Sequence, residues 1–382
     1  MSSPRHTPPR RAREPEGPAH DGLTVAALRR FAVGRSLFPA VSLPAALDVL
    51  GFVQADPIRA PARAQDLTLR HRVAGYRAGD LEQAYPGLDV FEDFFVNYGF
   101  VTRGVHALMH PRGGRVPWTA ARGRHVPALL EFVRQRGTVH PRDVSDHFAH
   151  GTVTNYWGGS SSATTHLLDA MHYRGLLRVA GREGGIRLYA VHPPADRVQD
   201  ADTRRARLDA LVDVVVRKYA PLPAASLAVL VRRLRYAVPQ WSGELSTALG
   251  RARRRLSSAR VDGVEWYWPA DESPLLEEPA ASVRLLAPFD PVVWDRRRFE
   301  LLWGWPYRFE AYTPVAKRQY GYYALPLLWR AAVIGWANLK IERGRLTPLV
   351  GYSSGRPPNG REFRMALDEE LHRVGVFLRL HD

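Results

Sequence analysis

An amide and a carboxylate stand two residues apart in the segment Phe52-Val-Gln-Ala-Asp-Pro57. Asp56 precedes Pro57, and the residue before a proline is biased toward extended backbone. Side chains at i and i+2 of an extended chain point the same way, so we expect Gln54 and Asp56 to share one face. Such a pair could hold and deprotonate one water molecule. The alternative, from spacing alone, is that Asp56 caps a turn and Gln54 is a surface polar residue.

Arginines follow this pair closely, at Arg59, Arg63, Arg70 and Arg72. Guanidinium groups bind phosphate oxygens, and such contacts position a protein on a nucleic acid without reading its sequence. We therefore predict that Arg59, Arg63 and Arg70 hold phosphates around the candidate site.

Helical patterns lead into this segment. The sequence predicts helices near residues 24–33 and 43–50, and Gly51 suits the left-handed position that ends a helix. A clearer unit follows in the middle of the chain, where residues 126–133 carry apolar side chains at i, i+3, i+4 and i+7. Two further helices and a hairpin with a Gly-rich tip come next. This order is typical of a winged-helix fold.

The same order recurs over residues 208–268, where the third predicted helix carries the run Arg251-Ala-Arg-Arg-Arg255. From about residue 280 the composition changes to aromatic and β-branched residues. We interpret residues 287–294, 320–328 and 332–339 as strands and residues 360–374 as a final helix.

The predicted fold is therefore α+β, with three tandem winged-helix units followed by a β-rich C-terminal domain. The boundaries are 1–22 for a disordered basic tail, 23–120, 121–195 and 196–272 for the three units, and 273–382 for the C-terminal domain. The fold alone leaves the function open. Three such units in one chain suggest wrapping around one DNA segment.

The charge balance points to a polyanionic partner. Lys plus Arg is 54 and Asp plus Glu is 38, which gives a net charge of +16, and nucleic acid is the simplest partner. A GC-rich codon bias explains Arg in place of Lys, but it does not explain the excess of cations. The chain has no cysteine, which excludes disulfides, thiolate zinc sites and a cysteine nucleophile. No apolar run approaches the ~18 residues of a membrane span, and we expect a cytoplasmic protein.

A long motif in the C-terminal part narrows the function. It reads Pro288-Phe-Asp-Pro-Val-Val-Trp-Asp-Arg-Arg-Arg298 and continues as Tyr307-Arg-Phe-Glu-Ala-Tyr-Thr-Pro-Val-Ala-Lys-Arg-Gln-Tyr-Gly-Tyr-Tyr-Ala-Leu-Pro-Leu-Leu328. With Gln54-Ala-Asp56, this block resembles the YcaQ/AlkZ-type DNA glycosylases, a crosslink-repair family built on three tandem winged helices. The resemblance covers roughly residues 23–380.

The resemblance implies monofunctional hydrolysis of the N-glycosidic bonds of alkylated bases of the N7-alkylguanine type, including interstrand crosslinks. By similarity, Gln54 positions the water, and Asp56 acts as general base or stabilises positive charge on the deoxyribose. The implied partner is double-stranded DNA with alkylated bases. We expect a monomer at the nucleoid that needs no membrane, no metal and no small-molecule cofactor.

The resemblance also places residues 313–321 close to the lesion. We expect Lys317 and Arg318 to hold phosphates and Tyr320 to stack, with Arg296 and Arg297 as further DNA contacts. The alternative is a structural hairpin with a solvated charged face.

Two departures from the family pattern leave the lesion open between crosslinks, monoadducts and a natural-product adduct. The stretch after Asp56 lacks the acidic or aromatic residue and the histidine that many members carry, and Asn97 stands where a family histidine is expected.

His106 and His110 have a spacing that two metal ligands can share, but the sequence nearby supplies no carboxylate, so we predict no metal site. The alternative function is that of a non-catalytic winged-helix DNA-binding protein, such as a transcriptional regulator.

Overall fold

The computed structural model describes residues 22–113, 118, 120–148, 151–154, 160–193, 198, 200–274 and 278–380. The predicted basic tail, residues 1–22, lies outside this range except for its last residue. Among the described residues, no helix is both long enough and apolar enough to cross a bilayer.

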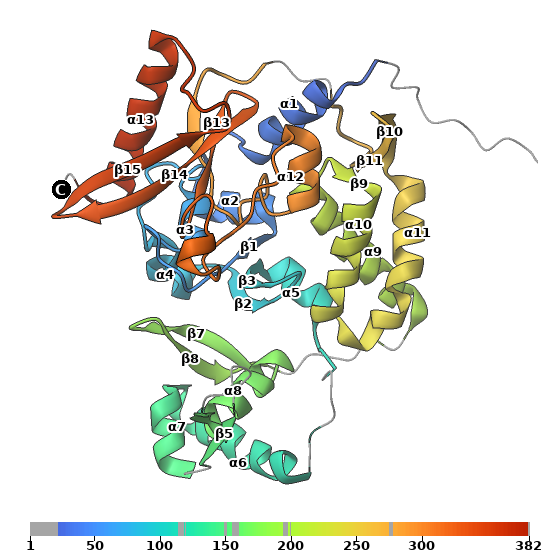
Figure 1. The fold of residues 1–382 in the computed structure, drawn as a ribbon. Helices are drawn as coiled ribbons and strands as arrows, with labels where there is room; N and C mark the ends of the chain where they lie inside the picture. Colours follow the sequence, from blue (N-terminus) through green and yellow to red (C-terminus); the bar gives the residue numbers. More distant parts are fainter. Residues whose placement is uncertain are drawn as a thin grey trace, which may run out of the picture.

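The N-terminal segment surrounds a small antiparallel sheet with helices (Figure 1). Its helices are α1 (Val25–Ser36), α2 (Leu43–Leu50), α3 (Ala64–Leu69), α4 (Asp80–Ala84), the 3-10 turn η1 (Tyr85–Gly87) and α5 (Arg103–Met109). Its strands are β1 (Phe52–Gln54), β2 (Val90–Phe94) and β3 (Tyr98–Thr102), in the order β1-β3-β2. The Thr24 and Ser42 side chains cap α1 and α2 by accepting backbone N–H bonds. The predicted helices are therefore confirmed, and Gly51 ends α2 with the expected left-handed φ of 62°.

The second segment forms the lower part of the molecule in Figure 1. It contains α6 (Ala120–Arg136), β4 (Thr138–Val139), α7 (Pro141–Phe148), β5 (Thr152–Thr154), β6 (Ser160–Ser162), α8 (Ala163–Tyr173), β7 (Leu177–Glu183) and β8 (Ile186–Val191). The apolar stripe of α6 is buried at Leu129 and Val133, as its spacing predicts. Strands β7 and β8 form the expected hairpin, and β4 adds to its edge in the order β4-β8-β7.

The third segment is another group of helices followed by a hairpin. It contains α9 (Ala201–Tyr219), β9 (Leu222–Pro223), α10 (Ala224–Arg233), the 3-10 turns η2 (Leu234–Tyr236) and η3 (Pro239–Glu244), α11 (Leu245–Arg255), β10 (Ser257–Val261) and β11 (Val264–Trp268). The stripe predicted for the first of these helices is fully buried from Leu208 to Val215. The order helix, helix, helix, hairpin is therefore present in this segment too.

The C-terminal segment contains a four-stranded antiparallel sheet, in the order β12-β13-β14-β15, with one long helix against it (Figure 1). Its elements are β12 (Val283–Leu285), α12 (Arg296–Trp303), η4 (Val315–Lys317), β13 (Leu325–Trp329), β14 (Ala332–Glu342), β15 (Arg345–Tyr352) and α13 (Arg361–Phe377). The strand predicted at residues 287–294 is wrong, because this stretch forms turns. Asp290 organises them by accepting the backbone N–H of Val292 on its side chain and that of Trp294 on its carbonyl.

Large apolar clusters run across the segments. One cluster joins the N-terminal and second segments to the C-terminal sheet and includes Val53, Leu168 and Leu325. Another joins the N-terminal segment to the third and includes Phe52 and Val215. Neighbouring residues of β1 therefore pack into different clusters, which fixes both faces of the strand that leads into Gln54 and Asp56.

Candidate active site

Strand β1 is held at its position by a glycine on the neighbouring strand. Gly99 of β3 pairs with Gln54 in the antiparallel ladder. A Cβ at Gly99 would lie 2.2 Å from the carbonyl oxygen of Val53 and 2.8 Å from the Cα of Gln54. These are backbone atoms, so they cannot move aside without moving the strand. Only glycine therefore permits this close approach at residue 99.

Gln54 is 6% exposed, and its amide has one defined orientation. Its side-chain oxygen accepts a hydrogen bond of 2.7 Å from the indole N–H of Trp294. Tryptophan is a donor only, so the partner atom on Gln54 must be the oxygen. The –NH₂ group is therefore the part of this amide left to act on a water or substrate, and it can only donate.

Asp56 is half-buried directly after β1. One carboxylate oxygen accepts the backbone N–H of Ile58 at 2.9 Å, and the backbone N–H of Asp56 donates to the Gln65 side chain at 3.4 Å. The carboxylate thus does organise a turn, as the alternative interpretation held. Burial raises the pKa of Asp56, and the hydrogen bond from Ile58 opposes that rise. A carboxylate with a raised pKa is a stronger proton acceptor.

A cavity of about 420 Å³ opens beside Asp56. Its far wall comes from the β7–β8 hairpin of the second segment, through Arg182, Arg187 and Tyr189. Arg182 pairs with Glu92 at 2.6 Å, and the Arg187 guanidinium lies over the ring of Tyr98 at 5.3 Å. Cavities of this size accommodate small ligands.

A C-terminal loop also approaches the carboxylate. Burial, followed by the charge of Asp56, raises the pKa of both Tyr312 and Tyr323. The Tyr312 side chain is 74% exposed, whereas Tyr323 is buried. Asp56 is therefore bordered by the second segment on one side and by the C-terminal segment on the other.

The joint action of the amide and the carboxylate on one water stays a prediction. Gln54 contacts Trp294, whereas Asp56 lines the cavity under the β7–β8 hairpin. Among the described residues no hydrogen bond links the two side chains directly.

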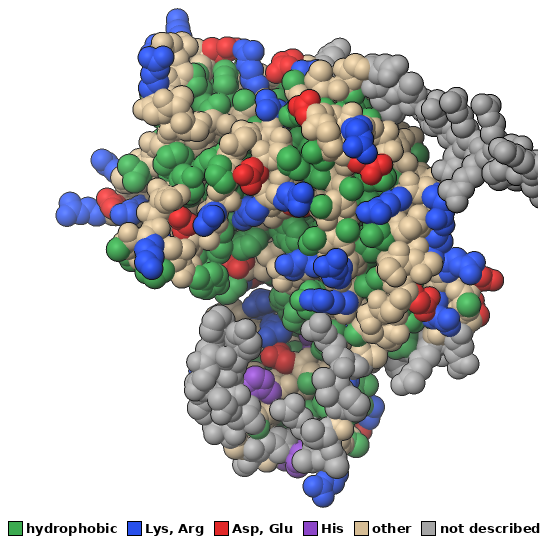
Figure 2. Space-filling model, turned by 45° about the vertical axis from the view of Figure 1, so that its right-hand side comes forward, with side chains coloured by type: hydrophobic (Ala, Val, Ile, Leu, Met, Phe, Trp, Pro, Cys, Tyr) green, Lys and Arg blue, Asp and Glu red, His purple; other side chains and the backbone are tan. Residues whose placement is uncertain are grey.

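Several predicted DNA contacts lie at the surface. Arg59, Arg297 and Lys317 are exposed. Arg59 and Tyr320 line one groove along β14 and β15. Figure 2 shows Lys and Arg side chains close together near the centre of the face drawn. The exposed Arg59, Arg297 and Lys317 are available for phosphate contacts.

Arg318 and Tyr320 are half-buried and already have partners. Arg318 donates to the carbonyl of Thr313 at 2.8 Å and stacks over Tyr322. The Tyr320 hydroxyl accepts from the indole of Trp305 at 3.0 Å. This hydrogen bond favours a structural role for Tyr320, although Tyr320 also lines the groove.

Two of the predicted DNA contacts point into the protein instead. Arg70 forms a buried ion pair of 2.5 Å with Glu370, and its side chain is 4% exposed. The prediction for Arg70 is therefore wrong, because α13 covers it. Arg296 donates to the carbonyls of Val293 and Pro288, which commits its guanidinium to the turn before α12.

Arg63 and Arg72 are also paired with acids. Arg63 forms an ion pair with Glu82. The fully buried Arg72 pairs with Asp290 at 2.7 Å, and so ties the end of α3 to the turn that leads to Trp294.

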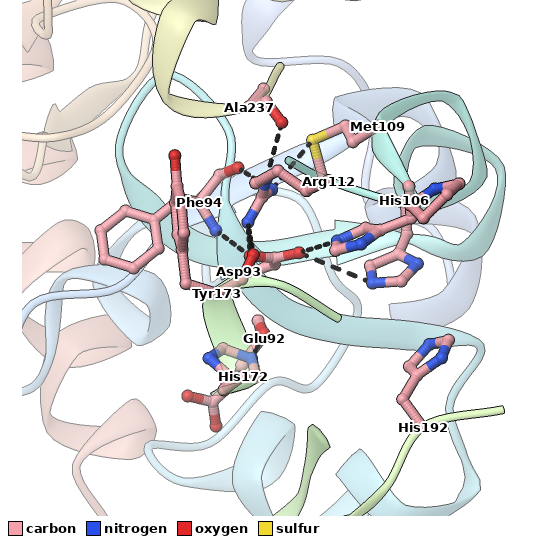
Figure 3. A network of polar contacts seen from close by, with 12 residues as sticks. Glu92, Asp93, Phe94, His106, Met109, Arg112, His172, Tyr173, His192 and Ala237 are labelled. Atoms are coloured by element: carbon pink, nitrogen blue, oxygen red, sulfur yellow. Dashed lines mark hydrogen bonds and ion pairs between the residues drawn. The ribbon is translucent and has the colours of Figure 1, made fainter. Parts of the chain in front are cut away.

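A buried polar network lies beside β2, and the sequence did not reveal it (Figure 3). The side chains of His106 and His110 both face one carboxylate oxygen of Asp93, at 3.5 and 2.7 Å. The sequence next to these histidines supplies no carboxylate, but the fold brings Asp93 of β2 to them. The three ligand atoms lie within 4.8 Å of one another.

The charges in this network are already balanced. Arg112 donates to the second oxygen of Asp93 at 2.8 Å. Burial alone would raise the pKa of Asp93, but Arg112 and then His110 lower it well below its usual value. Burial and the neighbouring His110 lower the pKa of His106 to about 2, so its imidazole is neutral. A buried guanidinium beside the carboxylate disfavours a cation there, and the absence of a metal stays our prediction.

Asn97, which stands at the expected histidine, lies close to the amide side of the site. It lines a cavity together with Trp294, the partner of Gln54. Its side-chain oxygen accepts the backbone N–H of Tyr98 at 3.0 Å.

Comparison with known proteins shows the family and the fold of the chain. A family model described as "DNA glycosylase AlkZ-like" matches residues 47–377. Among solved structures, the Streptomyces sahachiroi DNA glycosylase AlkZ is similar, with a TM-score of 0.60 and 14% sequence identity. The alignment covers 93% of this chain and 96% of that chain, and at this identity the likeness shows a common fold. Because the family match spans most of the sequence, the chain belongs to the AlkZ-like DNA glycosylases, enzymes of DNA repair that cleave N-glycosyl bonds.

Proposed function

We propose that this glycosylase hydrolyses the N-glycosidic bond of bases alkylated at guanine N7, as monoadducts or as interstrand crosslinks. The observation that carries the proposal is the Gln54 amide, which Trp294 fixes so that its –NH₂ can donate to a water oxygen. Asp56 follows two residues later, with a pKa raised by burial. Donor and proton acceptor are the two groups that activation of one water requires.

Hydrolysis replaces the C1′–N9 bond with a C1′–O bond. The water oxygen attacks C1′ of the deoxyribose, and its proton passes to Asp56. The C1′–N9 bond breaks, and its electron pair neutralises the positive charge that N7 alkylation has placed on the base. The base thus leaves without strong acid assistance, so one carboxylate suffices where ordinary glycoside hydrolysis commonly uses two. Asp56 can also stabilise the positive charge that develops on the sugar.

The element order supports a wider proposal about architecture. In three successive segments, helices are followed by a hairpin that ends at Thr102, Val191 and Trp268. We infer three tandem winged-helix units with the predicted boundaries, which together present the lesion to Asp56. We also propose that one copy of the chain acts on duplex DNA at the nucleoid. Light scattering of the complex tests the number of copies bound.

The activity is tested with a duplex that contains a single N7-methylguanine. Release of the free base should require Asp56, and Asp56→Asn or Asp56→Ala should lose about 10²–10⁴-fold in rate, the usual contribution of a positioned base. Binding of undamaged duplex should persist in both variants. Asp48→Asn is the matched control, because this exposed carboxylate lies on α2, eight residues earlier. Unchanged turnover in Asp56→Asn would remove Asp56 from the mechanism.

The lesion is identified by comparing substrates in the same assay. Duplexes with a methyl monoadduct, a bulky N7 adduct and an N7–N7 crosslink should be cleaved at different rates. If none of the three releases a base, the proposed lesion class is wrong.

A further inference from the structure

A second cavity of about 420 Å³ lies beside Trp294, the hydrogen-bond partner of the Gln54 amide. It is enclosed by α10 of the third segment, by the turn at Asn97, and by the residues around Trp294 and Arg297. No group of the mechanism above uses this cavity, although the indole that fixes Gln54 forms part of its wall.

The first turn of α10 faces this cavity. The helix begins at Ala224 after Pro223, and no side chain in the described part of the chain caps its N-terminus. Ala225 and Ser226, the second and third residues of the helix, line the cavity. The first N–H groups of a helix have no partner within the helix, and they carry its positive dipole end, so this position attracts anions.

Ser226 provides an independent sign of a missing ligand. Its side chain is 2% exposed, and its hydroxyl has no hydrogen-bond partner among the described residues. Buried hydroxyls are almost always hydrogen-bonded. An acceptor oxygen placed in the cavity would satisfy this donor together with the helix N-terminus.

The charged side chains around the cavity favour an anion. Arg297 is exposed at its rim, and the Arg233 guanidinium stacks 5.2 Å from the ring centre of Trp294. Arg296 adds a third positive charge. Asp295 is the opposing group in the lining, and its carboxylate accepts the backbone N–H of Arg298 at the start of α12. Cationic side chains therefore outnumber the one carboxylate in the lining, although the Arg296 guanidinium is committed to the carbonyls of Val293 and Pro288.

We propose that the N-terminus of α10, with Ser226 and Arg297, binds a phosphodiester of the DNA strand next to the lesion. The identification of the anion as DNA rests on the proposed function, since a free phosphate would present similar oxygens. A phosphate held here would lie next to the indole that orients Gln54, and it would set the register of the strand relative to the catalytic amide.

The test exploits the fact that helix stability and phosphate binding respond oppositely to a carboxylate. Ala225→Asp places a negative charge in the first helical turn, where it stabilises a helix but repels a phosphate. Ala225→Asn has the same shape without the charge and is the matched control. Thermal melting should show the Asp variant at least as stable as the Asn variant.

Affinity is measured on an undamaged duplex over a series of salt concentrations. Relative to Ala225→Asn, we expect Ala225→Asp to bind about tenfold more weakly, with a slope of log K against log salt smaller by about one. Ser226→Ala should lose roughly threefold. Equal affinities and slopes for the two Ala225 variants would overturn the proposal.

Arg297→Gln gives a second reading that does not disturb the helix, with Arg364→Gln on the exposed face of α13 as its control. Only Arg297→Gln should reduce the salt slope.

Titration of inorganic phosphate into the unmodified protein distinguishes the two sources of the anion. Tight binding of free phosphate, combined with equal duplex binding by the two Ala225 variants, would assign the site to a free anion. Because these measurements use undamaged DNA, they stand apart from base release and fail independently of it.

Discussion

Replacement of Trp294 by phenylalanine isolates the hydrogen bond that orients the Gln54 amide. The change removes the indole N–H, which donates to Gln54 at 2.7 Å. It keeps an aromatic ring against Tyr219, whose ring centre lies 5.3 Å away, and beneath the guanidinium of Arg233. Folding should therefore be affected much less than catalysis.

The size of the effect follows from the burial of Gln54. At 6% exposure, the amide oxygen would lose its partner in a place that water reaches poorly. A buried acceptor without a partner costs about 1–3 kcal/mol. The amide can avoid this cost by rotating, but the rotation turns its –NH₂ away from the water. The orientation that donates to the water is therefore less stable by a similar free energy. A penalty of about 1–2 kcal/mol lowers the rate roughly 5–30-fold.

The assay is single-turnover release of N7-methylguanine from a duplex at saturating enzyme, in a double-mutant cycle with Gln54→Ala. If Trp294 acts through the amide, Trp294→Phe should change the rate less than about twofold once Gln54 is absent, since interacting residues are not additive. Tyr219→Phe is the control, because it alters the ring beside Trp294 and leaves the amide untouched. Equal losses from Trp294→Phe in both backgrounds would refute the reasoning.

Four further predictions concern Asp56, Gly99, Arg112 and Asp93. Base release should rise with pH as Asp56 deprotonates, with the rise shifted above the ordinary carboxyl pKa because burial raises it, and a pH–rate profile of Asp56→Asn should lack that limb. Gly99→Ala should lower both the melting temperature and the rate, since its Cβ meets the β1 backbone, whereas Gly104→Ala, which has open space around it, should lower neither. Arg112→Met should destabilise the fold by about 3–5 kcal/mol in urea unfolding, because it removes the guanidinium that pairs with the buried Asp93 carboxylate. The stability that Asp93 contributes is present above its unfolded pKa and should be lost as the pH falls toward its depressed folded pKa, and a wild type that is equally stable at low pH would contradict this.

Local patterns predicted the helices well, because their signals lie within a few residues. The end of α2 at the left-handed Gly51, for example, is encoded by neighbouring positions alone. The stretch 287–294 was mistaken for a strand, because its apolar residues resemble one. Two prolines and the turn-forming Asp290 determine its conformation instead.

The candidate site was predictable only in part. The spacing of Gln54 and Asp56 indicates a shared chemistry, but the partner of Gln54 stands 240 residues away, at Trp294. Arg70 illustrates the same limit in reverse, since its partner Glu370 lies 300 residues away and turns an apparent DNA contact into a buried ion pair. Such long-range pairs are set by the packing of whole segments, which no local pattern encodes.

The guanidinium of Arg112 has a mechanical consequence. It donates to Asp93 and to the carbonyls of Phe94, Tyr173 and Ala237, which belong to three successive segments of the chain. Moving any one of these segments away from the others would break hydrogen bonds to the buried Arg112 guanidinium. We therefore expect the three segments that Arg112 joins to move together as one body when the protein binds DNA.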